Sequence, residues 1–465
     1  MSRRKKIIIV GVLIAVEVLI CVASVALLAA SRFPFSEVRF FYVADTRAEE
    51  TIEDRFATDG PPRLDLSNAH GDVQIAAGDD DQFVVKAIKE AWGQDQREAE
   101  ARLQAIEVKM TMDGGTLRVE VEDPARQTTF VFATVRASQV RFEITAPRQT
   151  AVTAHTRHGE VTLEGTAGDA DLTSQHGEVT LQGTTGDADL TSQYGDITIN
   201  DVSGSVKANT NNGQVTVLRV GGEGATIDLH SHYGDVAARQ LTASELTLDS
   251  NNGKLNLEDA TVHGDLTLNS HYGRVDLDGV HASSLTVKTQ NGTINLRDSQ
   301  VEGKLDLYSH YGAVSVAGTT ATDYKIETNN GAIELDGGGG PLWLHSRYGD
   351  IEVRGAHDAT LDLNTNNGKV RFEGSLSAEA DHTVESNYGT VTLRLPPDTA
   401  FILEANTDYG RIRCDFDVLV KGGNDEKEER RSSGDELHGT INGGGNRLRV
   451  KTHNGDVIIE VEPSK

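Results

Sequence analysis

Apolar and polar residues alternate over most of this chain, in short runs that return at a nearly constant interval. In one unit, Leu266 and Leu268 share a parity, and Val275 and Leu277 continue the same face after a one-residue shift at Gly273. Alternation with period two predicts β-strands that have one buried face. Because glycine accepts a positive φ, each pair of runs is predicted to be two strands bent around a corner.

The corner itself is a repeated phrase: Ser or Thr, any residue, then His, Tyr or Asn, then Gly. It occurs sixteen times, with Asn68 replacing the hydroxyl residue once, and the steps from Gly159 to Gly410 are 18 to 21 residues. A short fixed period is typical of stacked copies of one unit, so the sequence predicts an all-β fold, a single-chain β-solenoid. We expect a right-handed coil of 19–20 residues; a coil of two units, about 39 residues, also fits the period.

The residue before the corner glycine alternates strictly between Tyr and Asn in the central array. Because Tyr has the parity of the buried leucines, its ring is predicted to fill the bend, and the Ser/Thr hydroxyls to bond neighbouring backbone. An exposed row of aromatic rings that binds polysaccharide is the alternative. The residues predicted to have the structural corner role are Tyr194, Gly195, Asn212, Gly213, Tyr233, Gly234, Asn252, Gly253, Tyr272, Gly273, Asn291, Gly292, Tyr311, Gly312, Asn330, Gly331, Tyr348, Gly349, Asn367 and Gly368.

Recurring histidines raise the question of a metal site. His232, His271 and His310 precede corner tyrosines, and His230 lies close by; all have the outward parity. In a one-unit coil the first three are two coils apart, about 9.6 Å, too far to share an ion. A two-unit coil would bring them within about 4.8 Å. We expect no metal and no cofactor.

The N-terminus predicts a membrane anchor. Residues 7–30 are almost entirely apolar and follow the basic residues of the tail 1–6, which orients the N-terminus to the cytoplasm. The apolar run is longer than that of a cleaved signal peptide, the rival interpretation. Glu17 near its middle is either a contact for a partner helix or a tolerated carboxyl.

The remaining chain divides by pattern. Residues 31–61 are predicted to be a stalk, 62–150 a cap with a helix over 95–106 and a hairpin around Gly114, and 151–415 the solenoid. Residues 416–465 hold a charged loop at 424–436 and closing strands that end in the last copy of the phrase. A helix and a hairpin suit a cap because the terminal units of an array must cover its open core.

Charge and cysteine content narrow the function classes. The chain carries −27, and because residues 1–31 contribute +3, the rest carries −30. Such a body repels nucleic acid, so we expect no nucleic-acid partner. Cys21 and Cys414, the two cysteines, are too widely separated in context to form a disulfide, and no cysteine spacing typical of a metal site occurs.

The Asn-Gly and Tyr-Gly corners, the strand 140–147 before the array and the Gly-rich stretch before Gly455 resemble bacterial DUF4097-type β-strand-repeat proteins, commonly labelled adhesins. The resemblance covers about residues 62–463 and implies a fold rather than an activity; some relatives sit beside envelope-stress systems. The expected function is a non-enzymatic, single-pass cell-membrane protein with an extracytoplasmic solenoid. It would act as an adhesin-like surface or scaffold that contacts envelope polysaccharide or another envelope protein.

Two other function classes remain open. A β-helix lyase or hydrolase would need a deep, acid-lined cleft that interrupts the repeat. The acids are spread evenly instead, and the least regular unit, with Arg347 and Asp350 near the run 337–340, is the best position for such a site. A self-assembling filament would need an uncovered terminal coil, which the helix and the charged loop argue against.

Overall fold

The computed structural model describes residues 46–122, 137–420 and 436–463. These residues form two compact units. The first includes described residues 46–49, 90–105 and 137–138, and the second includes 50–89, 106–122 and the described chain from 139 onward. The membrane anchor expected at 7–30 and most of the charged loop expected at 424–436 lie outside the described residues. Within the described part, no helix is both long and apolar enough to cross a membrane.

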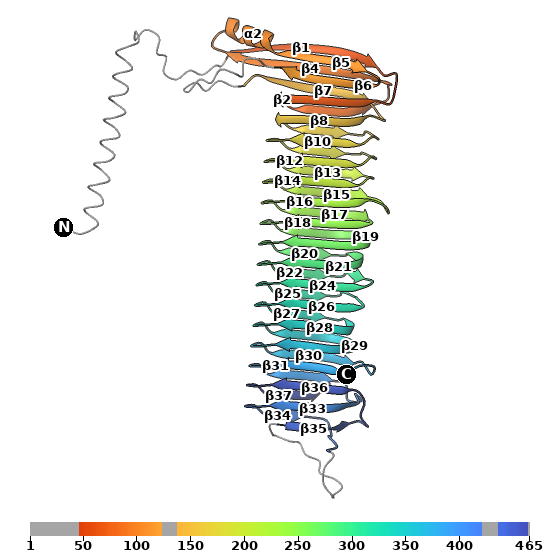
Figure 1. Cartoon of the computed structure of the whole chain (residues 1–465), viewed down its shortest axis with the longest axis vertical. Helices are drawn as coiled ribbons and strands as arrows, with labels where there is room; N and C mark the ends of the chain where they lie inside the picture. Colours follow the sequence, from red (N-terminus) through yellow and green to blue (C-terminus); the bar gives the residue numbers. More distant parts are fainter. Residues whose placement is uncertain (1–45, 123–136, 421–435, 464–465) are drawn as a thin grey trace, which may run out of the picture. The chain divides into compact units, whose positions relative to one another are not determined.

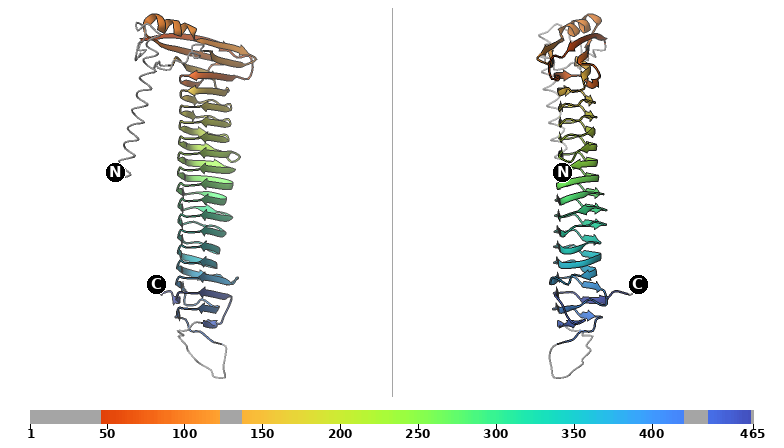
Figure 2. Two further views of the ribbon diagram at one scale, coloured as in Figure 1. Left: turned by 60° about the vertical axis from the view of Figure 1, so that its left-hand side comes forward. Right: turned by 90° about the vertical axis from the view of Figure 1, so that its right-hand side faces the viewer.

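The second unit is a β-solenoid whose strands lie one over another in two columns (Figures 1 and 2). The strands that precede the corners are β2 (Arg63–His70), β8 (Ala151–His158), β10 (Ala170–Ser174), β12 (Ala188–Ser192), β14 (Val206–Thr210), β16 (Thr226–Ser231), β18 (Glu245–Ser250), β21 (His281–Thr289), β24 (Lys304–Ser309), β26 (Asp323–Thr328), β28 (Gly339–Ser346), β31 (His382–Ser386), β33 (Phe401–Thr407) and β36 (Arg447–Thr452).

The strands that follow the corners are β3 (Val73–Gly78), β9 (Val161–Glu164), β11 (Val179–Gln182), β13 (Ile197–Val202), β15 (Val215–Gly221), β17 (Val236–Ala243), β20 (Val275–Asp278), β22 (Ile294–Arg297), β25 (Val314–Ala317), β27 (Ile333–Asp336), β30 (Val370–Leu376), β32 (Val391–Leu395), β34 (Ile412–Cys414) and β37 (Val457–Val461). Two long strands, β19 (Leu255–Ser270) and β29 (Ile351–Thr365), run through both columns. Outside these columns are β1 (Thr46–Ala57), β4 (Gln82–Gly93), β5 (Glu107–Asp113), β6 (Thr116–Glu122), β7 (Gln139–Pro147), β23 (Gln300–Val301) and β35 (Glu436–Ile441).

Strand register settles the length of one coil. Leu172 pairs with Leu190, a step of 18 residues, and Val206 pairs with Ile227, a step of 21. The pairing is parallel and in register in both columns. One unit of the repeat therefore makes one coil, which confirms the expected 19–20 residues and excludes the two-unit coil.

The core lies between the two columns and is formed by inward side chains from both strands of each coil. Leu266 and Leu268 are fully buried, and Val275 and Leu277 continue the buried face after the corner, as the alternation predicts. Each coil contributes only a few such residues, so a chain with 37% apolar residues can still fill a continuous core. Core residues of successive coils lie in register, for example Leu248 with Leu268, so each coil covers the core of the next.

The corner hydroxyls face inward and bond backbone, as predicted. Ser250 Oγ accepts a hydrogen bond from Gly253 N at 2.9 Å and donates to Gly234 O of the preceding coil at 3.0 Å. Ser231 makes the equivalent pair of bonds one coil earlier. Each hydroxyl thus stabilises its own bend and ties it to the previous one, which satisfies polar groups that would otherwise be buried unpaired.

The corner glycines are required for a reason other than the predicted one. From Gly177 onward their φ angles are not positive; a Cβ at Gly273, for example, would overlap the carbonyl oxygen of Gly253. From Gly159 onward the same overlap recurs at every corner, with the glycine before it in the stack. Glycine is needed because successive corners approach each other closely, not because of a left-handed backbone.

Positive φ angles instead mark a second corner, six residues after each corner glycine from Gly159 to Gly368. Gly165 and Gly183 occupy this position in two early coils, with φ of 77° and 69°. In later coils Asp259 (53°) and Gln240 (56°) adopt the same conformation. This left-handed position turns the chain back toward the next coil.

The last copy of the phrase occupies an unexpected place. The sequence predicts that it closes the array, but β36 pairs with β31 on one side and with β33 on the other. The corner glycines therefore stack in the order Gly389, Gly455, Gly410. The final strands, β36 and β37, insert between two earlier coils. At this end of the described column the order of the coils in space therefore differs from their order in the sequence.

The first unit contains the helix predicted over 95–106. Helix α2 (Gln96–Ala105) buries Ala99 and Leu103. At its start Asp95 Oδ1 accepts a hydrogen bond from Glu98 N at 2.9 Å, and the carboxylate of Glu98 accepts one from Gln94 N. These two bonds satisfy N–H groups that the first turn of a helix leaves free. The predicted hairpin is also present in the second unit, where β5 and β6 pair antiparallel.

A histidine replaces leucine in the core column at one position. His382 is 2% exposed and lies in register with Leu448. Its Nδ1 accepts from Leu361 N at 3.3 Å and its Nε2 donates to Ser377 O at 3.1 Å, so the ring is held neutral. Burial lowers the pKa of His382 below its ordinary value because the cation is poorly solvated in the core.

We predict that His382 makes the solenoid acid-sensitive. Below about pH 6.5 the unfolded chain binds a proton that the folded chain rejects, so stability falls as the pH drops, by up to about 1.4 kcal/mol for each pH unit. His382→Leu should flatten the loss of the urea midpoint between about pH 7 and about pH 5. His281→Asn, at an exposed position, is the matched control and should keep the wild-type slope. An unchanged slope in His382→Leu would refute the assignment.

Candidate functional site: the corner groove and the tyrosine row

A long groove runs beside the corners from the coil of Ser67 to that of His310. It has a volume of about 1320 Å³ and is lined by ten successive coils, which at one strand spacing per coil gives a length of roughly 43 Å. Its outer row, four residues before each corner glycine, comprises Ser67, His155, Thr173, Thr191, Asn209, His230, Asp249, Asn269, Lys288 and Tyr308. Its inner row, two residues before the glycine, comprises Ala69, Arg157, Gln175, Gln193, Asn211, His232, Asn251, His271, Gln290 and His310. We call this feature the corner groove.

The inner row is a ladder of amides and imidazoles. Gln175 Nε2 donates to Gln193 Oε1 at 3.0 Å, and His232 Nδ1 lies 2.7 Å from Asn251 Nδ2. The contact recurs further along, where His310 Nδ1 lies 2.6 Å from Asn329 Nδ2. Hydrogen bonds between adjacent coils hold these side chains in fixed positions, so the wall of the corner groove is preorganised.

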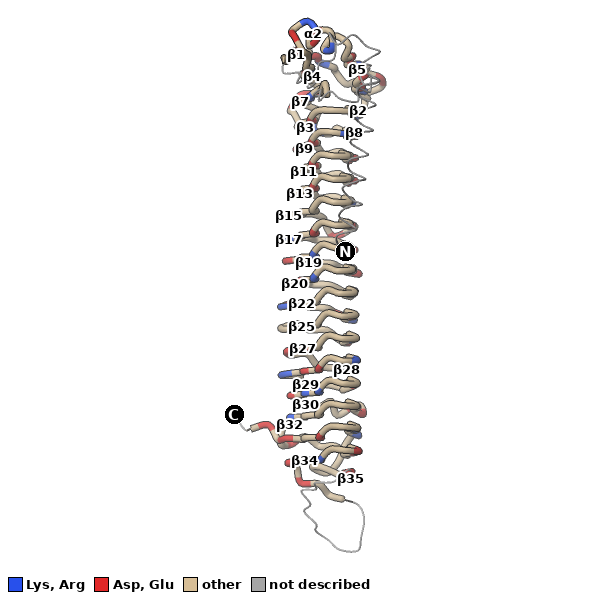
Figure 3. Tube along the Cα trace, turned by 90° about the vertical axis from the view of Figure 1, so that its left-hand side faces the viewer, with Lys and Arg blue, Asp and Glu red and all other residues tan. Residues whose placement is uncertain are grey.

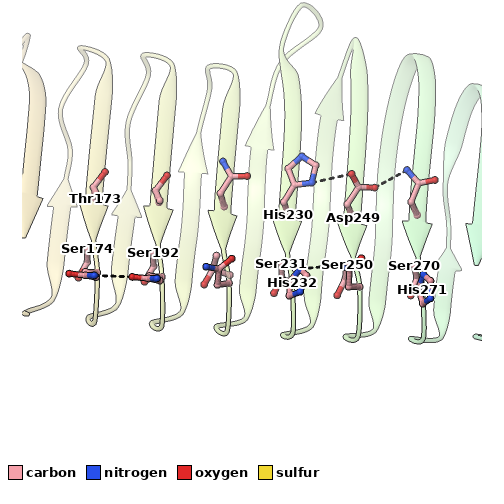
Figure 4. A pocket seen from close by; sticks show the side chains of 18 of the residues that line it. Thr173, Ser174, Ser192, His230, Ser231, His232, Asp249, Ser250, Ser270 and His271 are labelled. Carbon is pink, nitrogen blue, oxygen red and sulfur yellow. Dashed lines mark hydrogen bonds and ion pairs between the residues drawn. The ribbon is translucent and has the colours of Figure 1, made fainter. Parts of the chain in front are cut away.

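The outer row holds one ionic cluster. His230 Nδ1 lies 3.0 Å from Asp249 Oδ2, its Nε2 contacts Asp228, and Asn269 Nδ2 donates to Asp249 at 2.8 Å. Figure 4 shows His230 reaching toward Asp249, apart from the row that contains His232 and His271. The hydrogen bond to Asp249 raises the pKa of His230 although partial burial opposes it. Burial acts to raise the pKa of Asp249, but the hydrogen bonds from His230 and Asn269 outweigh it and hold that pKa below the usual value.

The corner tyrosines are exposed, so the predicted burial of these rings is wrong. The chain bends over the two residues before the glycine, and both of them face solvent. The exposed fraction is 51% at Tyr194 and reaches 76% at Tyr409. We define the tyrosine row as Tyr194, Tyr233, Tyr272, Tyr311, Tyr348, Tyr388 and Tyr409.

From Tyr194 to Tyr311 the tyrosine row borders the corner groove, and its last three rings lie in coils beyond the groove. The rings of His232 and Tyr233 have centroids 4.4 Å apart, and those of His310 and Tyr311 also lie 4.4 Å apart. Where the row begins, His158, His176 and Tyr194 stack face to face at 4.4 and 4.8 Å. The histidines of the inner row thus join the polar groove to the aromatic row in one continuous surface.

Because one repeat unit makes one coil, the recurring histidines do not lie in adjacent coils, the arrangement that a shared metal ion would need. His232 and His271 lie two coils apart, with Asn251 between them. No cluster of three or more potential metal ligands occurs among the residues that the structure describes. His232 and His310 instead contact the side-chain amides of Asn251 and Asn329.

Asp350, in the unit that the sequence favours for an enzyme site, has a backbone partner that recurs at other corners. Asp350 Oδ1 accepts from Lys369 N at 2.7 Å, and Asp196 and Asp235 make the same bond one coil onward. Arg347 lies over the ring of Tyr348, 5.4 Å from its centroid. Figure 3 shows charged residues scattered along the column, and Asp249 is the one carboxylate among the described residues that line the corner groove.

Comparison with known proteins identifies one family and does not indicate an activity. A search of curated proteins finds no match. Among solved structures, one from Clostridium sporogenes ATCC 15579, described as a "putative cell adhesion protein", shares 10% identity and covers 89% of this chain and 100% of its own; its TM-score of 0.16 supports no argument. The Toastrack DUF4097 family model matches residues 149–240, 225–336, 301–395 and 342–460, well over half of the sequence. The chain belongs to the DUF4097 (Toastrack) family.

Proposed function

We propose that this protein is a non-enzymatic, membrane-anchored component of the cell envelope whose solenoid binds an extended polymer. The polymer lies along the corner groove with the tyrosine row as its contact edge. The bulk of the chain is extracytoplasmic, held by the apolar segment 7–30 and its basic flank.

The observation that carries the proposal is a long polar groove bordered by exposed aromatic rings at regular intervals. Sites for small molecules are compact and enclose the ligand, whereas this groove extends over ten coils and is open along its length. Tyrosines offer a flat apolar surface and a hydroxyl, and they lose little conformational entropy on binding. Many equal contacts along a line favour a polymer over a single small ligand.

The chemistry of the corner groove supports binding rather than catalysis. Acid–base cleavage of a polysaccharide needs two suitably placed carboxylates. Asp249, the single carboxylate among the described lining residues, is already bonded to His230 and Asn269. The repeated amides of the inner row are neutral donors and acceptors, which suit recognition of hydroxyl-rich chains.

The test is binding of the full-length chain, purified in detergent, to a panel of immobilised envelope polysaccharides, peptidoglycan and purified envelope proteins. We expect retention on at least one polysaccharide, with an affinity that rises with polymer length as more coils are engaged. If the chain is retained on none of the polymers, the proposal is overturned, and the protein would be a scaffold without a carbohydrate ligand.

A further inference from the structure

The Tyr/Asn alternation before the corner glycines is preserved in space where it fails in sequence. Along the chain Tyr388 is followed by Tyr409, two tyrosines in succession. The inserted final strands place Gly455 between Gly389 and Gly410, so that Asn454 lies between the two rings in the stack. The order Tyr, Asn, Tyr therefore continues through the rearranged end of the column.

Packing does not impose this alternation. At the opposite end, the corner position carries rings in four successive coils, and His70, His158 and His176 stack at 4.5 and 4.4 Å. His176 stacks on Tyr194 in turn, with an interplanar angle of 0°. Because consecutive coils accommodate rings, an asparagine in every second coil of the tyrosine row needs another explanation.

The alternating asparagines are available to a ligand. Asn252 and Asn291 are exposed on either side of Tyr272, and their side-chain amides bond no other described residue. The inner-row amides, by contrast, bond one another across coils. The row thus presents a stacking ring and a free amide in turn, with a period of two strand spacings, about 9.6 Å.

We propose that the tyrosine row binds an uncharged β-1,4-linked glycan, with one disaccharide for every two coils. This inference rests on the proposed polymer-binding function and names its ligand class. In an extended β-1,4-linked chain successive sugars are turned over, so the same sugar face returns once per disaccharide, at a distance close to two strand spacings. Each such face can stack on a tyrosine while the intervening sugar hydroxyls meet the asparagine.

Other polymers fit less well. An extended peptide repeats every two residues at about 6.8 Å, which does not match the row. A polyproline helix repeats at about 9.3 Å but has no N–H groups, so it could not donate a hydrogen bond to the carbonyl oxygens of the free asparagine amides. An anionic polymer would be repelled, because the chain beyond residue 31 carries a net charge of −30. The neutral β-1,4-linked chain satisfies both the spacing and the hydrogen-bonding groups.

The test is a pair of composition-matched swaps in the full-length chain, Tyr272→Asn with Asn291→Tyr and Tyr348→Asn with Asn367→Tyr, which together leave no three tyrosine rings spaced two coils apart for a hexamer to use. Both residues already occur at this corner position, so the fold should be kept, and circular dichroism and the melting temperature check it. Calorimetry with cellohexaose and chitohexaose measures affinity, and maltohexaose and a proline-rich peptide are the comparison ligands. We expect the β-1,4-linked hexamers to bind best and the two swaps to weaken them about fivefold, the value of one stacking contact.

The outcomes separate this inference from the function on which it rests. Equal binding by the swapped chain, or equal or tighter binding of maltohexaose or the peptide, would overturn the glycan assignment. If a polymer still binds and the loss of several tyrosines abolishes that binding, the general function stands without this ligand. If no polymer binds the wild-type chain, both proposals fall.

Discussion

Gly273→Ala should destabilise the solenoid by about 3 kcal/mol or more, because the new methyl group would overlap backbone that has no room to move. The obstructing atom is the carbonyl oxygen of Gly253 in the preceding corner. Moving either corner would break the hydrogen bonds of Ser250 and Ser270. Since stability in a repeat array is carried by neighbouring interfaces, the defect should weaken the column at its middle.

Hydrogen exchange and chemical denaturation measure this effect. Amides of β18, β19 and β21 should lose protection first in the variant, and the denaturation midpoint should fall. Gly224→Ala is the matched control, since a Cβ there would meet nothing within 4 Å, and it should change stability by less than about 0.5 kcal/mol. A Gly273→Ala chain as stable as this control would contradict the close-approach explanation of the corners.

Removing three neighbouring rings should nearly abolish polymer binding. Tyr233→Ala, Tyr272→Ala and Tyr311→Ala together remove three exposed rings of the tyrosine row. At about 1 kcal/mol for each aromatic contact beyond its buried area, the affinity should fall at least about a hundredfold. The rings are exposed and touch mainly the neighbouring histidines, so the fold should be unaffected.

The corresponding triple substitution to Phe is the control for the ring itself. It keeps the flat apolar surface and removes only the hydroxyls, so we expect it to retain most of the affinity. The quantity compared is the dissociation constant for one polymer from the panel, measured on chains with equal melting temperatures. An alanine variant that binds as tightly as the wild type would place the polymer elsewhere on the column.

Much of the fold could be predicted from local rules. The alternation around Leu266 and Leu268 predicts the buried face, and the spacing of the corner phrase predicts the coil length. The hydroxyl of Ser270 also behaves as predicted, because a small polar side chain inside a bend must bond backbone. These features depend on neighbouring residues in one chain segment or on the period itself.

The errors arise where the chain stops being extended or where coils meet. Counting parity through a bend predicts a buried Tyr272 wrongly, because alternation holds only within a strand. The role of Gly273 depends on Gly253, a residue one coil away that the local sequence does not reveal. The insertion of Gly455 between earlier coils departs from the usual adjacency of consecutive elements.

The corner groove could not be predicted because its walls come from many separate segments. Each coil contributes only two outward residues, such as Asn251 and Asp249, about one period from the next pair. The available signal was the frequency of Asn, Gln and His two residues before the corner glycine. Once the one-unit coil is known, that position becomes a continuous row, and its chemistry can be assessed as a surface.

The location of the bound polymer can be measured by hydroxyl-radical footprinting of the full-length chain, with and without the polysaccharide that it retains. We predict that Tyr233, Tyr272 and Tyr311 become several-fold less reactive in the complex. Buried Tyr324 is the internal reference and should not change. Protection that leaves the tyrosine row unaffected and appears on another face, while the polymer is bound, would contradict the assignment of this row as the binding edge.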